Sequence, residues 1–131
     1  MANPNIVNVT TIYGTTTYYT PTGTTAVVLL NNAASSGKVY KINQIVAANV
    51  NGSTAVNATV SLYSNGAQSQ GSAPSGGTAY PIVSTVSVPA NASLVAVDKT
   101  TAIYLQEGQS ISVTSGTASG ITYSISFEDI S

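Results

Sequence analysis

The side chains that could carry out acid–base or nucleophilic chemistry are few. The sequence has no histidine and no cysteine, and its only carboxylates are Asp98, Glu107, Glu128 and Asp129. Without histidine or cysteine, neither a Ser–His–Asp triad nor a Cys–His pair can form. A two-carboxylate hydrolase would need Asp98 and Glu107 to face each other across a cleft. Both residues stand beside predicted turns, where a carboxylate is normally solvated, so we expect that the protein is not an enzyme.

The sequence also has few side chains that could bind a metal ion or a cofactor. A calcium site takes six or more oxygen ligands, commonly several carboxylates, and the D-x-D-x-D-G spacing is absent. The absence of cysteine excludes a thiolate metal site and a disulfide framework. We interpret Glu128 and Asp129 as a solubilising pair near the end of the chain. The sequence therefore predicts no catalytic residue, no metal site and no cofactor.

The charge balance excludes several classes of partner. Only 5% of the 131 residues are charged, against about 25% in ordinary soluble domains, and the net charge is −1. Three lysines without an arginine cannot neutralise a nucleic-acid backbone or anionic lipids. The longest apolar run, residues 26–30, is far short of the roughly 20 that a membrane span needs. The first residues lack the pattern of a secretion signal. We expect neither nucleic acid nor membrane as a partner, and synthesis without classical export.

The tyrosines are the remaining residues with a possible binding role. Tyr123 and Phe127 alternate with polar residues and are predicted to be core. Tyr13, Tyr18 and Tyr19 lie in a polar, threonine-rich segment, which leaves three interpretations: an edge strand packed on its own sheet, a protein interface, or a platform for sugar rings. The residues that we select as interface candidates are Tyr13, Tyr18, Tyr19, Pro21 and Thr24.

The elements that must position these residues are predicted to be strands. Apolar residues recur at every second position in several short runs, most cleanly at 121–127, and no helical stripe is present. Turn residues separate the runs at the spacing typical of a sandwich or barrel. We predict a single all-β domain over residues 1–131, an antiparallel, jelly-roll-like β-sandwich of about eight to nine strands. The expected runs are 5–13, 24–31, 39–50, 57–63, 80–88, 93–97, 102–105, 110–114 and 121–127.

Residues 38–63 are predicted to form a β-hairpin. Asn51 and Gly52 separate two β-rich runs and would supply the positive φ angles of a tight turn. In the first run Ile42 and Ile45 fall on opposite faces of a regular strand. We therefore predict a bulge near Asn43 and Gln44, or a strand buried on both sides.

Two segments fall outside the regular pattern. Residues 13–25 contain Pro21, which removes a hydrogen-bond donor, so they are predicted to form an edge strand or an extended arm. Residues 64–79 are rich in Gly, Ser, Gln and Pro and are predicted to be a mobile, solvent-facing loop.

Two stretches and the end of the chain carry a family resemblance. GKVYKINQIVAANVNGSTAVNATVSLY (37–63), VSVPANASLVAVDKTTAIYLQEGQSISV (86–113) and the closing ITYSISFEDIS resemble small virion structural proteins of tailed bacteriophages, especially phages of cyanobacteria and marine bacteria. The similarity covers roughly two-thirds of the chain and is weakest at 13–25 and 64–79.

The resemblance implies a place in the phage particle. It suggests a cement or decoration protein on the outer capsid surface, made in the bacterial cytoplasm, whose partner is the major capsid protein. It further implies a homo-oligomer, with a trimer at local threefold positions favoured, and residues 13–25 are the expected contact. The alternative is a neck, tail or head-fibre domain that binds host surface glycans through tyrosines.

Overall fold

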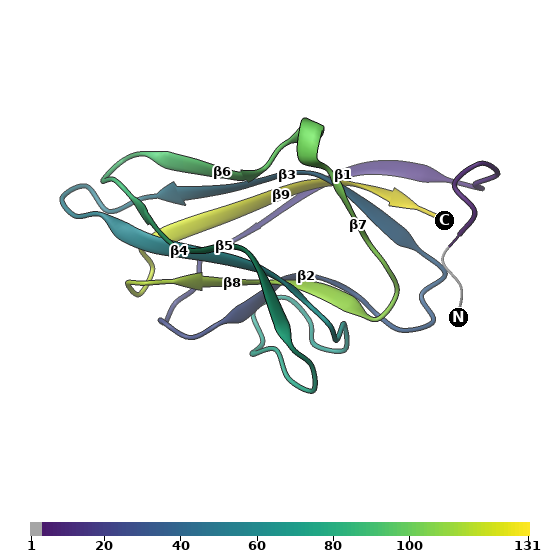
Figure 1. Cartoon of the computed structure of the whole chain (residues 1–131), viewed down its shortest axis with the longest axis horizontal. Coiled ribbons are helices and arrows are strands. Elements are labelled where there is room, and N and C mark those ends of the chain that lie inside the picture. The colour runs from purple at the N-terminus through teal and green to yellow at the C-terminus, as the bar shows by residue number, and fades with distance from the viewer. Residues whose placement is uncertain (1–3) are drawn as a thin grey trace.

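Two antiparallel β-sheets packed face to face form the molecule (Figure 1). The structure is a computed structural model and describes residues 4–131. Sheet A has the strand order β1-β9-β3-β6, with β7 also paired to β3, and sheet B has the order β2-β8-β4-β5. The bounds of the strands are β1 Ile12–Tyr19, β2 Val27–Asn32, β3 Val39–Asn49, β4 Val56–Tyr63, β5 Ala79–Val88, β6 Ser93–Val97, β7 Ile103–Leu105, β8 Gln109–Ser115 and β9 Ile121–Ile130. A single 3-10 turn, η1 (Lys99–Thr101), separates β6 from β7.

The strand pairing is nested, as in a jelly roll. β1 pairs with β9, β2 with β8, β3 with β6 and β7, and β4 with β5. β6 and β7 lie one after the other along β3, opposite Ile45–Ala48 and Tyr40–Ile42, so they act as one strand interrupted by η1. The prediction of an all-β, jelly-roll-like sandwich with eight to nine strands is confirmed.

The core lies between the sheets and is aliphatic with few aromatic residues. The β9 residues predicted to face inward, Ile121, Tyr123, Ile125 and Phe127, are all buried. β9 lies between β1 and β3 in sheet A, so the last strand is tied into the centre of the fold. The inward-facing residues of β9 pack against the inward-facing residues of sheet B.

The predicted hairpin at residues 38–63 is wrong. β3 belongs to sheet A and β4 to sheet B, so the two strands face each other across the core and do not share a ladder. Neither Asn51 nor Gly52 has a positive φ angle. Asn51 instead accepts hydrogen bonds on its side-chain oxygen from the backbone N–H groups of Ser53 and Thr54, at 2.9 and 3.2 Å. This Asx-type turn carries the chain from one sheet to the other.

The predicted bulge in the same stretch is confirmed. The register of β3 against β9 shifts between Ile42 and Gln44. The extra residue brings both Ile42 and Ile45 to the inner face, where each has no exposed surface.

The expected strand at residues 5–13 is also corrected, because β1 begins only at Ile12. The side chain of Asn5 accepts a hydrogen bond from the N–H of Val7 (3.0 Å), and the N–H of Asn8 donates to the carbonyl of Asn5 (3.1 Å). This local turn competes with an extended ladder and leaves Val7 91% exposed.

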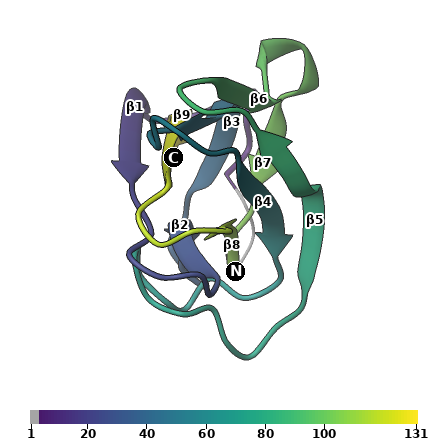
Figure 2. The same ribbon diagram turned by 90° about the vertical axis from the view of Figure 1, so that its left-hand side faces the viewer.

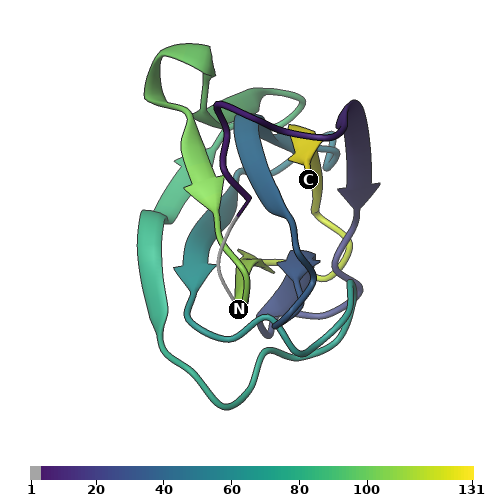
Figure 3. The same ribbon diagram turned by 90° about the vertical axis from the view of Figure 1, so that its right-hand side faces the viewer.

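Residues 64–79 run beneath sheet B and are fastened to it (Figures 2 and 3). The N–H of Gly71 donates to the carbonyl of Val28 (2.8 Å), and the N–H of Val28 donates to the carbonyl of Ser72 (2.9 Å). The hydroxyl of Ser110 donates to the carbonyl of Asn65 (2.8 Å). The outer-face residues of sheet B below which the segment passes are buried: Val28, Ser61, Tyr63, Ser110 and Ser112. The segment predicted as a mobile, solvent-facing loop is thus a hydrogen-bonded cover, although many of its own residues are exposed.

Candidate functional site

The four carboxylates are each engaged in local contacts. Asp98 caps η1 by accepting from the N–H groups of Thr100 and Thr101, and its hydrogen bonds to Thr100, chiefly that from the hydroxyl, lower the pKa of this carboxyl. Glu107 accepts from the N–H of Gly37 at 2.7 Å. Within the described part of the chain no three Asp or Glu residues are grouped so that they could hold a metal ion. The two residues considered for a hydrolase thus have separate partners.

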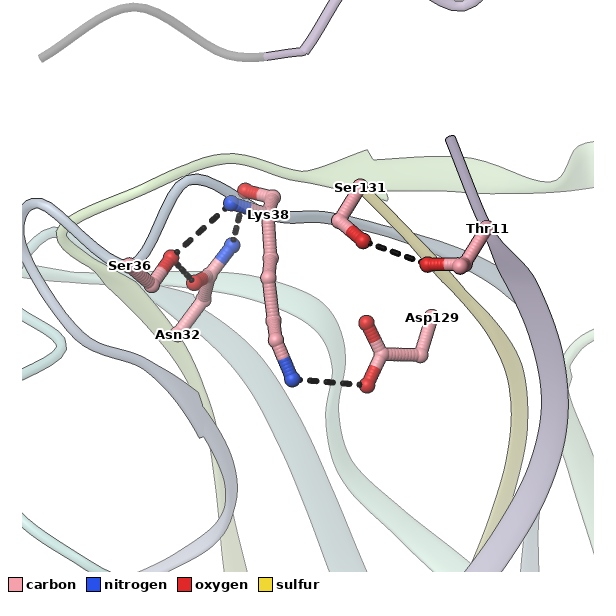
Figure 4. A network of polar contacts seen from close by, with 6 residues as sticks. All are labelled: Thr11, Asn32, Ser36, Lys38, Asp129 and Ser131. Atoms are coloured by element: carbon pink, nitrogen blue, oxygen red, sulfur yellow. Dashed lines mark hydrogen bonds and ion pairs between the residues drawn. The ribbon is translucent and has the colours of Figure 1, made fainter. Parts of the chain in front are cut away.

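The other two carboxylates lie on β9. Glu128 accepts from the amide of Asn43 (3.0 Å) and lies 3.9 Å from the ammonium of Lys41. Asp129 binds Lys38 at 3.1 Å, and this hydrogen bond raises the pKa of Lys38. Figure 4 shows Lys38 reaching toward Asp129 at the end of the sandwich where the C-terminus lies. These ion pairs are surface contacts, each worth at most about 1 kcal/mol.

The free edge of β1 is the first feature with a binding geometry. β1 pairs on one side with β9 over its whole length, without a register shift, and no described strand pairs with its other side. Just before β1, Thr11 and Ser131 exchange both backbone hydrogen bonds at 3.0 Å. In an antiparallel ladder such pairs alternate with pairs whose backbone groups point away. The N–H and C=O groups of Ile12, Gly14, Thr16 and Tyr18 therefore point to the open edge.

The other strand edges are less accessible. Backbone hydrogen bonds to Gly71 and Ser72 occupy the outer edge of β2 at Val28. β5 contains Pro81, shifts register twice against β4 and has a positive φ at Thr85, all of which disrupt further pairing. β6 and β7 are only five and three residues long. β1, with eight residues and no charge or proline, lacks every one of these protections.

The five interface candidates separate into two groups. Tyr13 and Tyr18 are 62% and 70% exposed, and Thr24 is also exposed. Tyr19 is only half exposed, because it packs against the core and its ring lies beside Gly71. Pro21 is buried, and its carbonyl accepts from the N–H of Ser119 at 2.9 Å. Of the two structures predicted for residues 13–25, the edge strand is formed by residues 13–19 of β1, whereas residues 20–25 belong to no strand.

A second exposed surface was not predicted from the sequence: the outer face of sheet A, which in contrast to that of sheet B is open. Tyr18, Ser124, Val46 and Val95 lie opposite one another in a single row across β1, β9, β3 and β6. Tyr18 and Val95 at the two ends of this row are 70% and 51% exposed. Strand alternation can indicate which residues face away from the core. Only the order of the strands in sheet A brings these four residues into one row.

The same face ends in an apolar pocket. Val39, Tyr104 and Gln106 line it together with Pro4 and Ile6, which come from the segment before β1, and its volume is about 260 Å³. Val39 lies opposite Ile130, which in turn lies opposite Ile12, so a row of aliphatic side chains crosses this end of sheet A.

Comparison with known proteins assigns the chain to no family. No family model, no curated protein and no solved structure gives a significant match to it. No helix among residues 4–131 is long and apolar enough to cross a membrane. The features that bear on function are therefore the open β1 edge, the open face of sheet A and the resemblance in the sequence.

Proposed function

We propose that the protein is a structural component of a tailed-phage virion, a cement or decoration protein that binds the outer capsid surface and stabilises the shell. The observation that carries the proposal is the unprotected edge of β1. Monomeric β-proteins usually block such edges with charges, prolines, bulges or covering loops. This chain covers the β2 edge with residues 70–72 and leaves the longer β1 edge free.

The free edge gives a mechanism for attachment. An extended segment of the major capsid protein can add to β1 as a further strand, bonded to the outward groups of Ile12, Gly14, Thr16 and Tyr18. Backbone bonds of this kind need no matched charges, in keeping with a β1 strand that has none. A bound copy that bridges neighbouring capsid subunits adds buried area where the shell is held together against internal DNA pressure.

The glycan-binding alternative is less well supported. It requires tyrosines that present their rings together, and Tyr18 and Tyr19 are neighbours on one strand, so their side chains point to opposite faces of sheet A. Tyr19 is packed against the core and Gly71. Of these two tyrosines only Tyr18 remains on the open face. Tyr104 also lies on that face, but on β7, which β9 and β3 separate from β1, so the two rings form no shared platform for a sugar.

Reconstitution of shells tests the proposal. Particles that lack the protein are mixed with the wild-type chain or with Thr16→Pro or Thr16→Ala variants, and bound protein and the temperature of DNA release are measured. Proline removes an N–H that points to the open edge and leaves the bonds to β9 in place, so the fold is retained. Both variants lose the 3.0 Å contact between the hydroxyls of Thr16 and Ser126, which makes Thr16→Ala the matched control.

We expect wild type and Thr16→Ala to bind and to raise the release temperature, and Thr16→Pro to bind at least about tenfold more weakly. If Thr16→Pro coats the shells as well as Thr16→Ala does, attachment through the β1 edge is wrong. Equal release temperatures with and without the wild-type protein would reject the cement function itself.

A further inference from the structure

The geometry points to the outer face of sheet A as the surface on which a second copy of this chain packs, with its own sheet A facing the first. The inference goes beyond the proposed function, which does not specify the number of copies, and it departs from the trimer that the resemblance in the sequence favours. It adds the surface that joins the copies and the symmetry of the contact, which is a two-fold pair.

Exposed apolar side chains gather on this face. Among residues 4–131 nine large hydrophobic residues are conspicuously exposed, and four of them, Ile12, Tyr18, Val95 and Tyr104, lie on this face by their strand register. Ile6 lines the pocket on the same face. Sheet B presents only Tyr80 from its strands. An apolar patch concentrated on one face of a small domain marks an interaction site.

Two pairs of hydroxyls on this face keep their hydrogen bonds within the chain. The hydroxyls of Thr16 and Ser126 bond each other at 3.0 Å, and those of Thr20 and Thr122 at 2.8 Å. Groups that keep their hydrogen bonds on association lose little on leaving water. The side chains of Thr16, Ser124 and Ser126 on β1 and β9 are short, which favours the close approach of a second sheet.

The face carries no net charge. Its strands present Lys41 and Glu128 there, which lie 3.9 Å apart, and the adjoining η1 turn bears Asp98 and Lys99, again one of each sign. A face without net charge does not repel its own copy. A partner with a strongly charged surface would find no excess of opposite charge on this face. This favours a second copy as the occupant.

The area of the face fits a specific but weak contact. Along β9 the face runs from Thr122 to Ile130, about 27 Å, and four strands are about 19 Å wide. The footprint is thus about 500 Å² on each copy and about 1,000 Å² for the pair, near the lower limit for a specific interface. We expect association in the micromolar to near-millimolar range, which a crowded particle surface would reinforce.

Sedimentation equilibrium at protein concentrations from micromolar to near-millimolar tests the inference. Tyr18 on the face and Tyr80 on β5 serve as the matched test and control positions. Tyr18→Lys and Val95→Lys place a charge on the face, and Tyr80→Lys places the same charge on β5 at a tyrosine that is 60% exposed. We expect wild type and Tyr80→Lys to form dimers, little affected by salt, and each of the other two variants to associate at least about tenfold more weakly. Circular dichroism melts check that all variants are folded.

Three results would overturn the inference: a wild type that stays monomeric, dimers that Tyr18→Lys and Tyr80→Lys weaken equally, or a closed trimer, which a two-fold contact cannot build. A monomer whose Tyr18→Lys variant no longer coats shells would assign the face to the capsid protein, which also overturns the inference. The proposed function is judged separately, by shell binding and DNA release. Dimers that fail to bind shells reject that function alone, and monomers that bind reject the inference alone.

Discussion

Tyr123 is the largest side chain that the core encloses completely. Its ring lies on the inner face of β9, and its hydroxyl donates a hydrogen bond to the carbonyl of Thr114. Burial raises the pKa of Tyr123 to about 12, from the ordinary value of 10.0, because the tyrosinate would be separated from water. The position of this residue in the core was predicted by its place in the alternation of 121–127, but its hydrogen bond depends on strand neighbours that the alternation does not give.

The pKa of Tyr123 makes stability depend on alkaline pH. Because the folded pKa is raised, its contribution is complete below pH 10, where both states are protonated, and is lost as the pH rises through 12. We expect the free energy of unfolding to fall by about 2 kcal/mol more in the wild type than in Tyr123→Phe over this interval. Urea titrations at several pH values measure the difference.

At neutral pH the Tyr123→Phe variant is expected to lose stability for a different reason. Tyr123→Phe leaves the carbonyl of Thr114 without its partner and should lose about 1 kcal/mol. A variant that loses stability above pH 10 as steeply as the wild type would show that another group is responsible.

At the scale of elements, two buried asparagines hold the crossings between the sheets. Asn32 ends β2, and its amide donates to the carbonyls of Lys38 and Leu105 at 2.9 and 3.0 Å. Asn49 ends β3, and its amide donates to the carbonyls of Thr54 and Val88 at 3.0 and 2.9 Å. In each case one side chain satisfies a carbonyl of the crossing that follows it and a carbonyl at the end of a strand in the other sheet, where no ladder can do so.

Removal of one of these amides should be costly. Asn49→Ala leaves two carbonyls and the N–H of Asn51 without their partner, so we expect a loss of about 2–4 kcal/mol in the free energy of unfolding. Asn57→Ala is the control, since Asn57 is exposed at the second position of β4, and it should change stability by less than about 0.5 kcal/mol. Chemical denaturation measures both. Similar losses for the two variants would mean that the crossing does not depend on Asn49.

These crossings also explain what the sequence could and could not predict. The bulge at Asn43 and Gln44 was predictable, because two isoleucines at an odd spacing can share a buried face only if one residue is added. The hairpin was not, because alternation shows which residues of β3 and β4 face the core and not whether the strands share a sheet. An Asn-Gly pair suits a tight hairpin, but the side chain of Asn51 makes it a crossing here.

At the scale of the whole molecule, the two outer faces differ. Nested pairing joins β1 to β9, more than a hundred residues away, and this order alone creates the open face of sheet A and the edge of β1. Neither the open face nor the free edge could be predicted from local patterns. The polar segment that contains Tyr13, Tyr18 and Thr24 did indicate that these side chains are accessible, and all three are exposed. Residues 64–79 were predicted as mobile from their composition, but composition does not show that the same small residues allow a close approach to sheet B.

Gly66 is where this approach is closest. A Cβ atom at Gly66 would lie 2.3 Å from the carbonyl oxygen of Asn32 and 2.6 Å from that of Gln109, both backbone atoms that cannot move aside. Gly66→Ala should therefore lift the cover from sheet B and cost at least about 2 kcal/mol. Gly52→Ala is the matched control, since its Cβ would meet only the side chain of Asn91, at 3.9 Å, and its φ angle is not positive.

Hydrogen exchange at Val28 reports the cover directly, because its N–H donates to the carbonyl of Ser72. We expect this amide to exchange faster in Gly66→Ala than in wild type or Gly52→Ala, while amides of β9 keep their protection. Binding to shells should survive in Gly66→Ala, since the β1 edge lies in the other sheet. Unchanged exchange at Val28 would mean that the segment is not held by its contact at Gly66, whereas loss of shell binding would place the attachment surface on sheet B and not on sheet A.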